Sequence, residues 1–376
     1  MVERSRRPSA RLWLAGAVFA IAAAIAPLLQ PGSSSARTAD PVVATGTAGR
    51  SITVMATGEI LPHPSVVAHA LAGDGYDFGP MFSDLAPLLG AADLAICHLE
   101  VPVAPAGTAL SGYPVFGIPA EIGTGIQSGG WDRCSTASNH SNDKGTKGIA
   151  ATLNALDAAG VGHSGTARTP KEAARIPIVT VQGLDVAHLS YTWGFNGTAP
   201  SQPWMANVIE PSTILADARA ARSAGADLVV ISLHWGDEYD RSGNDQQRSL
   251  AQQLLASPDI DLLVGTGPHV LQPVLESNGK FALLSLGNVV ANQGSEHPDT
   301  YDGAVATVTF TVADDGTVHS AAPVVRPTWY DAAAGRVRLL PVALGDASLT
   351  AERPLFEASW ARTSAVLGPF VIAIDR

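Results

Sequence analysis

Residues 227–267 have the sequence DLVVISLHWGDEYDRSGNDQQRSLAQQLLASPDIDLLVGTG. The apolar runs at 227–235 and 261–267 lack the alternation of a half-exposed strand, and strands that are covered on both faces have this pattern. Between them, residues 245–256 carry a helical pattern that ends before Pro258. A strand, a helix and a second strand in this order predict a βαβ unit and therefore a parallel sheet.

Similar patterns recur along the rest of the chain. Further buried strands are predicted at 52–58, 93–100, 134–138 and 281–288, and further helices at 148–159 and 214–223. Two segments are typical of hairpins: 176–191, interrupted at Gly183, and 303–325, with Asp314-Asp315-Gly316 as its turn. The end of the chain predicts a helix with a polar face and a short strand. The sequence therefore predicts an α/β fold built on mainly parallel strands.

Composition limits the class of partner. The chain has 376 residues, 46% of them hydrophobic, and a formal net charge of −11. Binding to nucleic acid depends on phosphate contacts from basic residues, and no basic patch occurs beyond the first residues. A nucleic-acid partner is therefore not expected.

The first part of the chain has the features of an export signal. Arg4, Arg6, Arg7 and Arg11 precede an apolar run at 12–29, and small residues follow it. Residues 1–36 are therefore predicted to be a signal peptide or a retained membrane anchor, since the apolar run is just long enough to span a bilayer. Residues 37–50 are predicted to be a linker. The protein is expected to be secreted or anchored outside the cytoplasm, with a membrane contact through this segment if it is uncleaved.

Cys97 and Cys134 are the two cysteines of the chain. In an oxidising compartment they could pair. Both lie in predicted buried strands, where free cysteine is a common small hydrophobic residue, and this pattern slightly favours two free thiols.

Polar side chains follow the predicted strands at one end. Ligands of open α/β sheets bind outside the carboxyl ends of the strands, so these side chains are expected to gather there. They are Glu59, His98, Glu100, Asn139, His140, His234, His269 and Asn288. Carboxylate, amide and imidazole groups together are ligands for a divalent transition ion. The pattern predicts a metal site, although each residue alone is more often a solvated or hydrogen-bonded loop residue.

Six segments resemble, in order and spacing, the motifs of the CapA-type family of poly-γ-glutamate capsule synthesis, which is similar to the calcineurin-like metallophosphatases. The segments are ATGEILPH, DLAICHLEVPV, STASNHSNDKGTKGIAATLNALDAAGVGHSG, VVISLHWGDEY, LLVGTGPHVLQPV and LLSLGNVV. The resemblance implies a four-layer α/β/β/α sandwich over residues 51–325, with 326–376 as an extension packed on it. It also implies a role in making or exporting a cell-envelope polymer such as poly-γ-glutamate, with membrane synthesis proteins as partners.

The resemblance assigns roles to individual residues. It implies metal ligands at Glu59, Glu100, Asn139, His234 and His269, and a catalytic His140 that steadies charge on the leaving group. His98 stands where the family usually has Asn, and Glu59 where it usually has Asp. Gly267 stands in place of a usual His. Further candidates at the same edge are His63, which could replace the missing imidazole, and Asp143 and Glu238, which could orient ligands.

These departures weaken the predicted metal centre. A two-ion centre needs enough ligands for both ions, so the site is expected to hold one divalent ion (Mn, Fe, Zn or Mg) rather than two. Gly267→His is accordingly expected to raise metal occupancy if space permits. Two functions remain open: a capsule-synthesis protein with a degenerate metal site, and an active metal-dependent phosphoesterase or hydrolase acting on an envelope substrate.

Overall fold

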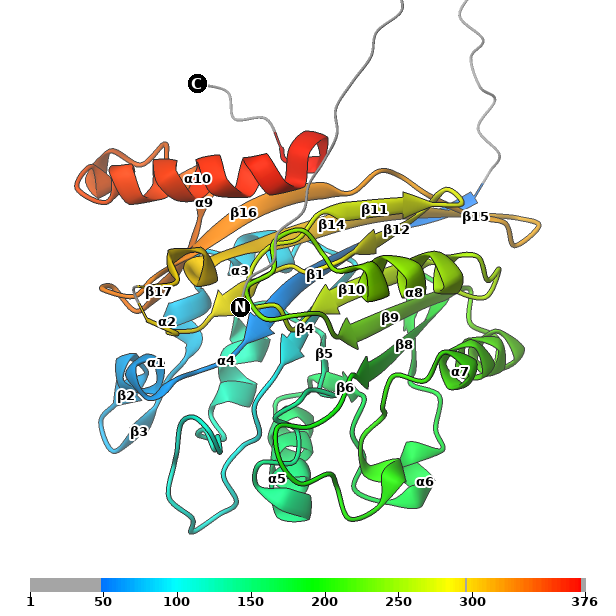
Figure 1. Cartoon of the computed structure of the whole chain (residues 1–376), viewed down its shortest axis with the longest axis horizontal. Coiled ribbons are helices and arrows are strands. Elements are labelled where there is room, and N and C mark those ends of the chain that lie inside the picture. Colours follow the sequence, from blue (N-terminus) through cyan, green and yellow to red (C-terminus); the bar gives the residue numbers. More distant parts are fainter. Residues whose placement is uncertain (1–48, 295, 373–376) are drawn as a thin grey trace, which may run out of the picture. The chain divides into compact units, whose positions relative to one another are not determined.

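The strands form two facing sheets in a computed structural model that describes residues 49–294 and 296–372 (Figure 1). Among these residues, the first sheet has nine strands in the order β17 (Arg336–Leu339), β16 (Val324–Asp331), β14 (Asp302–Ala313), β1 (Gly49–Ile60), β4 (Leu94–Leu99), β5 (Arg133–Ser135) and β6 (Gly162–Ser164), with β13 (Asn288–Val290) beside β1 and β15 (Val318–Ser320) beside β14. The second has six, in the order β11 (Val274–Ser277), β12 (Lys280–Leu283), β10 (Leu262–Thr266), β9 (Leu228–His234), β8 (Leu184–Thr192) and β7 (Ile178–Val181). The central strands of both sheets run parallel, as predicted.

Helices cover the outer faces of both sheets. The first sheet is covered by α1 (Pro64–His69), α2 (Gly79–Phe82), α3 (Ala86–Leu89), α4 (Ile122–Ser128) and α5 (Gly145–Ala158), and the second by α7 (Pro211–Ser223) and α8 (Asp245–Leu255). The remaining elements are the hairpin β2 (Leu71–Ala72) and β3 (Gly75–Tyr76), α6 (Pro170–Ala173), α9 (Leu340–Ala343), α10 (Arg353–Leu367) and the 3-10 turns Pro203–Met205, Pro298–Tyr301, Ala347–Leu349 and Gly368–Phe370. The helices predicted at 148–159, 214–223 and 245–256 correspond to α5, α7 and α8.

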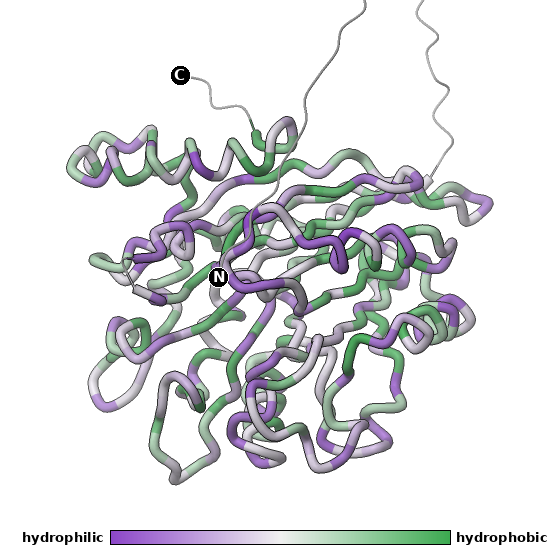
Figure 2. Tube along the Cα trace, viewed as in Figure 1, coloured by the Kyte–Doolittle hydropathy of each residue, from purple (hydrophilic) through white to green (hydrophobic). Residues whose placement is uncertain are grey.

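The core is divided into layers by the two sheets. One apolar cluster lies between the first sheet and its helices, a second between the sheets and a third between the second sheet and α7 and α8. Figure 2 shows the same pattern, with hydrophobic residues concentrated along the strands. This order of layers is the predicted four-layer α/β/β/α sandwich.

The space between the sheets changes from apolar to polar along the strands. Side chains two residues apart in a strand share a face. In β4, Ile96 faces the second sheet as part of the inter-sheet core, and His98 follows on the same face. In β9, Val230 is followed in the same way by Ser232 and His234. The fold therefore carries buried polar groups to the carboxyl ends of its central strands.

The strand predicted at 281–288 is wrong in one respect, because its two halves belong to different sheets. Residues up to Leu283 pair with β10 in the second sheet, whereas Asn288 pairs with Glu59 of β1 in the first. The chain crosses between the sheets at Gly287, which has a φ of 62°. An apolar run gives no sign of this crossing, since both halves are buried.

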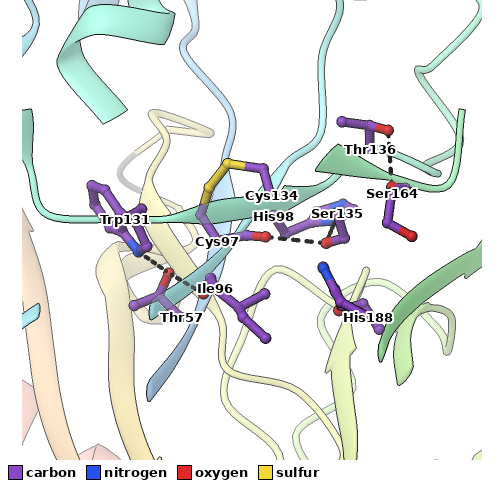
Figure 3. Close-up of a disulfide and its surroundings, with 11 residues drawn as sticks. Thr57, Ile96, Cys97, His98, Trp131, Cys134, Ser135, Thr136, Ser164 and His188 are labelled. Carbon is purple, nitrogen blue, oxygen red and sulfur yellow. Dashed lines mark hydrogen bonds between the residues drawn. A yellow bond between two sulfur atoms is a disulfide. The ribbon is translucent and has the colours of Figure 1, made fainter. Parts of the chain in front are cut away.

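Cys97 and Cys134 form a disulfide, so the preference for free thiols was wrong. They are register partners on the parallel strands β4 and β5, with Cα atoms 4.5 Å apart, a separation that a disulfide can bridge. Figure 3 shows the disulfide on one side of these strands and His188, from β8 of the facing sheet, on the other.

The structure describes most of the C-terminal part of the chain but not the predicted N-terminal signal or anchor. The predicted signal or anchor at 1–36 lies outside the described residues, as does the linker at 37–50 except for its last two residues, which begin β1. In the described part, no helix is long and apolar enough to cross a membrane. The boundary placed between residues 325 and 326 falls inside β16, and α10 packs on this strand, with Arg362 bound to the buried Asp302 at 2.8 Å.

Candidate metal site

Five of the predicted residues come together where the parallel strands end. One set of ligand atoms, from His98, Glu100 and His234, lies within 4.8 Å of one another, and so does a second set from Glu59, Glu100 and His269. Glu100 belongs to both sets. All five side chains are buried. They come from β1, β4 and β9 or directly follow β4 and β10, so the fold brings together residues up to 210 positions apart.

Several atoms of this site lack a hydrogen-bond partner. Among the described residues, His98 Nε2, both carboxylate oxygens of Glu100 and Asn139 Oδ1 are buried and unpaired. Buried polar atoms are normally satisfied, and burying them unpaired is costly. Every one of these atoms is a good ligand for a divalent ion. The residues present therefore fit a metal ion.

The two histidines of the first set are held with one nitrogen toward the site. The Ser135 hydroxyl lies 3.2 Å from the Cys97 carbonyl and 2.8 Å from His98 Nδ1 (Figure 3). When this hydroxyl donates to the carbonyl, it accepts from Nδ1–H, which leaves Nε2 of His98 as an acceptor. His234 is held in a similar way, because its Nδ1 lies 3.3 Å from Thr266 Oγ1. Contacts of this kind orient metal-binding imidazoles.

Burial keeps these two imidazoles neutral. It lowers the pKa of His98 to about 4 and the pKa of His234 well below its usual range. Burial also raises the pKa of the Glu100 carboxyl to about 7, and nearby Glu59 adds to this effect. Metal ligands must be deprotonated, and neutral imidazoles meet this requirement without losing a proton.

Glu59 and His269 of the second set form an ion pair instead. His269 Nδ1 donates to Glu59 Oε2 at 2.6 Å and lies 3.9 Å from Glu100 Oε2. Burial opposes the charged imidazole, but the two carboxylates outweigh it and raise the pKa of His269 to about 10. His269 has a φ of 62°, which is uncommon for a residue other than glycine and is often found at functional sites.

Gly267 contributes its backbone to the same pair. Its N–H donates to Glu59 Oε1, and its φ is 117°. A Cβ at this position would lie 2.5 Å from the Trp235 carbonyl oxygen and 2.9 Å from the Trp235 nitrogen. A side chain there would clash with the Trp235 backbone, so the condition attached to the Gly267→His expectation, that space permits, is not met. The imidazole missing from the sequence motif has no room in this fold.

His140 lies beside the site and is fixed from both sides. Its Nδ1 lies 2.7 Å from Asp143 Oδ2, which also accepts from the Phe116 backbone N–H. Its Nε2 lies 3.3 Å from Asn196 Nδ2. Asp143 thus orients His140, as a residue behind the ligands would.

The other candidates have different surroundings. His63 is engaged through Nδ1 with the Leu61 carbonyl and the Asn292 N–H, each at 3.1 Å, and belongs to neither set of ligand atoms. Asn288 is buried and donates through Nδ2 to Gln293 and to the Thr300 carbonyl, while its Oδ1 is unpaired. Glu238 is exposed, and its side chain makes no hydrogen bond or ion pair among the described residues, although its charge acts on Glu100 and His269.

Sequence reasoning missed the residues that position the ligands. Ser135 and Thr266 hold His98 and His234, and neither was a candidate. A signal existed for Ser135, because it follows Cys134 in the predicted strand that comes next in the sequence after the strand of His98, and consecutive strands are often neighbours. A hydroxyl within a buried strand needs a partner, and the neighbouring strand is where that partner must be.

Comparison with known proteins agrees with this geometry. The model of the family "Bacterial capsule synthesis protein PGA_cap" matches residues 53–293. The capsule biosynthesis protein CapA of Bacillus anthracis is 32% identical over 198 residues, which cover 51% of this chain and 47% of that protein. The PGA biosynthesis protein CapA of Bacillus subtilis (strain 168) is 33% identical over 170 residues, 42% of each chain.

The matches to these two relatives thus span less than half of the relatives' own length. Among solved structures, the calcineurin-like phosphoesterase YfkN from Bacillus subtilis aligns with 84% of this chain and 97% of its own, at 13% identity and a TM-score of 0.43. The family match covers well over half of the 376 residues. The chain therefore belongs to the PGA_cap family of bacterial capsule synthesis proteins.

Proposed function

We propose that this protein acts outside the cytoplasmic membrane in the synthesis of a poly-γ-glutamate-type capsule polymer, as a hydrolase that uses one tightly bound divalent ion. The observation that carries the proposal is the set formed by His98, Glu100 and His234, whose ligand atoms converge within 4.8 Å. Both Glu100 oxygens and His98 Nε2 have no protein partner among the described residues.

The two sets of ligand atoms differ in the protonation and orientation that metal binding requires. His98 and His234 are neutral and already oriented, whereas an ion between Glu59 and His269 would have to break their ion pair and remove a proton from His269. The first set therefore binds one ion tightly, and Glu59 and His269 remain paired beside it. The nitrogen and oxygen donors suit Mn, Fe or Zn better than Mg.

A bound ion would polarise an oxygen of the substrate and generate a nucleophile from water at neutral pH. The chain's own residues complete the site. His140 is held by Asp143 at Nδ1 and accepts from Asn196 Nδ2 at Nε2, and it would steady charge on a leaving group beside the ion. The pair of Glu59 and His269 adds fixed charges next to Glu100.

The location and the substrate rest on separate observations. The basic and apolar segment within residues 1–36 supports export, and so does a disulfide, since disulfides persist in oxidising compartments. The names of the two relatives, capsule biosynthesis and PGA biosynthesis, support the polymer. We infer that the partners are this polymer and the membrane proteins that make it.

Metal analysis of the purified protein tests the proposal. After dialysis, wild-type protein should retain close to one ion per chain. His234→Ala should lose it, because removing even an outer-shell partner typically lowers affinity ~10–100-fold. His319→Ala removes an exposed imidazole of β15 and should behave as wild type. Shortening of poly-γ-glutamate chains by wild type but not by His234→Ala completes the test. Failure to retain any ion, or equal retention by all three proteins, would contradict the proposal.

A second function is favoured by one specific feature, which is that Glu100 belongs to both sets of ligand atoms. A shared carboxylate is what a two-ion phosphoesterase uses to hold its ions ~3.5–4 Å apart. This alternative predicts two ions per chain after dialysis and rapid hydrolysis of a generic phosphomonoester. Both properties should then be lost in His234→Ala. The ion count therefore separates the two functions.

A further inference from the structure

A second polar cavity lies away from the candidate metal site. It has a volume of about 430 Å³ and lies where β6, at the edge of the first sheet, approaches β7 and β8 of the second. Its wall includes Arg133, His163, Arg168, Tyr191, Asn207 and Asp217. None of the described residues that line it belongs to either set of metal ligands. Its size is within the range of small-molecule sites.

Arg133 is the unusual member of this wall. Only 9% of the residue is exposed, and within residues 49–294 and 296–372 no carboxylate lies within 4 Å of its guanidinium. Its one hydrogen bond in this part of the chain runs from Nη2 to the His163 carbonyl at 3.2 Å, and Nε is buried without a partner. A guanidinium offers five N–H donors, so most of them lack an acceptor. Burial lowers the pKa of Arg133, and the charge of Asp132, which forms no ion pair with it, opposes this shift.

The neighbouring strand β6 has a glycine where the Arg133 side chain lies. Gly162 of β6 is the register partner of Arg133. A Cβ on Gly162 would lie 2.6 Å from Arg133 Nη1 and 3.0 Å from its Cζ, so the guanidinium lies directly over this glycine. Its position is therefore fixed by the fold.

Apart from the exposed Arg175, the other charges of the cavity are already engaged. Arg168 pairs with Asp157 and Glu172, each contact at 2.5–2.7 Å, and His163 contacts Asp157 at 3.0 Å. Asp217 accepts from the Tyr191 hydroxyl at 2.8 Å. These contacts leave Arg133 as the buried charge in this wall that has no counter-ion among the described residues. A planar group with two acceptor oxygens would satisfy it.

We propose that the cavity between β6 and β8 is a binding site for an organic carboxylate, which the Arg133 guanidinium holds through paired hydrogen bonds. A carboxylate supplies two coplanar oxygens that match the fork of a guanidinium. It also neutralises a charge that the fold buries alone, and an unpaired buried charge is unfavourable. The site is separate from the metal site and does not depend on the proposed function.

Titration calorimetry of the folded protein with glutarate, acetate and inorganic phosphate tests this site. Arg133→Gln should weaken carboxylate binding roughly 10–100-fold, the range expected for hydrogen bonds to a charged group. Gly162→Ala keeps the charge but displaces Nη1, and should weaken binding as well. Arg175→Gln is the matched control, because Arg175 lines the same cavity but is exposed, and it should bind as wild type.

The outcomes separate the explanations. Binding that survives in His234→Ala but is lost in Arg133→Gln and Gly162→Ala supports the site. Should Arg133→Gln fail to fold, as thermal unfolding would reveal, Gly162→Ala decides the matter alone. No binding, or equal binding by wild type, Gly162→Ala and Arg175→Gln, would overturn the proposal. Binding of phosphate but not of either carboxylate would overturn its ligand class.

Discussion

The backbone at Gly267 makes the sharpest prediction about the metal site. Gly267→Ala adds a Cβ 2.5 Å from the Trp235 carbonyl oxygen at a φ of 117°. The unfavourable backbone conformation costs about 1–3 kcal/mol, and overpacking against a rigid neighbour costs a similar amount. Their sum is on the order of 2–6 kcal/mol, which should lower the melting temperature by roughly 3–8 °C in a chain of this size.

Gly160→Ala is the matched control. Gly160 also has a positive φ, of 75°, but no heavy atom lies within 4 Å of the added Cβ. Only the backbone cost applies, about 1–2 kcal/mol. Thermal unfolding in the presence of EDTA compares the two variants without any contribution from bound metal. If Gly267→Ala proves no less stable than Gly160→Ala, then Trp235 moves aside freely and the reasoning about the missing imidazole fails.

Three further predictions concern the rest of the fold. Replacing Cys97 and Cys134 together by Ala should lower the free energy of unfolding by about 3–4 kcal/mol, because the disulfide closes a loop of 37 residues. Denaturant unfolding measures this loss, and an unchanged midpoint would contradict the prediction. Burial lowers the pKa of His188 well below its usual range, so below about pH 6.5 the unfolded chain binds a proton that the folded chain does not, and stability falls as the pH falls. His188→Gln should make the slope of unfolding free energy against pH shallower by up to about 1.4 kcal/mol per pH unit, and an identical slope would count against this role. Arg362→Met leaves the buried Asp302 without its cation and should cost about 3–5 kcal/mol, which calorimetry of the variant would detect.

Much of the architecture could be predicted from the sequence because the spacing of apolar residues indicates which faces of strands and helices are buried. Runs such as 227–235 and 261–267 are mostly apolar and do not alternate with polar residues, and this pattern indicates cover on both faces. The helix at 245–256 ends where Pro258 forbids its continuation. The prediction of one continuous strand at 281–288 was wrong because it also rested on burial alone. The pattern reports that a residue is buried, but not in which of two sheets.

The disulfide could not be predicted from the strands alone. Whether Cys97 and Cys134 pair depends on the register between β4 and β5, and a shift of one residue would place one thiol on the opposite face. The same register sets His98 opposite Ser135 and therefore decides which nitrogen of His98 faces the site. One structural variable, invisible in the sequence, thus controls both the covalent link and the orientation of a candidate metal ligand.

Two of the three departures from the family motif, Gly267 and His98, have different consequences in the structure from those that the sequence implies. On the sequence, Gly267 is a lost imidazole and His98 a replaced amide. In the structure, the Gly267 N–H supports Glu59, while His98 adds an imidazole to the set that contains Glu100 and His234. The site therefore has as many imidazoles as the family pattern implies, but one of them has moved from the Glu59 set to the opposite set. His98 Nε2 is unpaired among the described residues, whereas His269 is bonded to Glu59, and this difference supports the proposal of one strong ion rather than two equivalent ones.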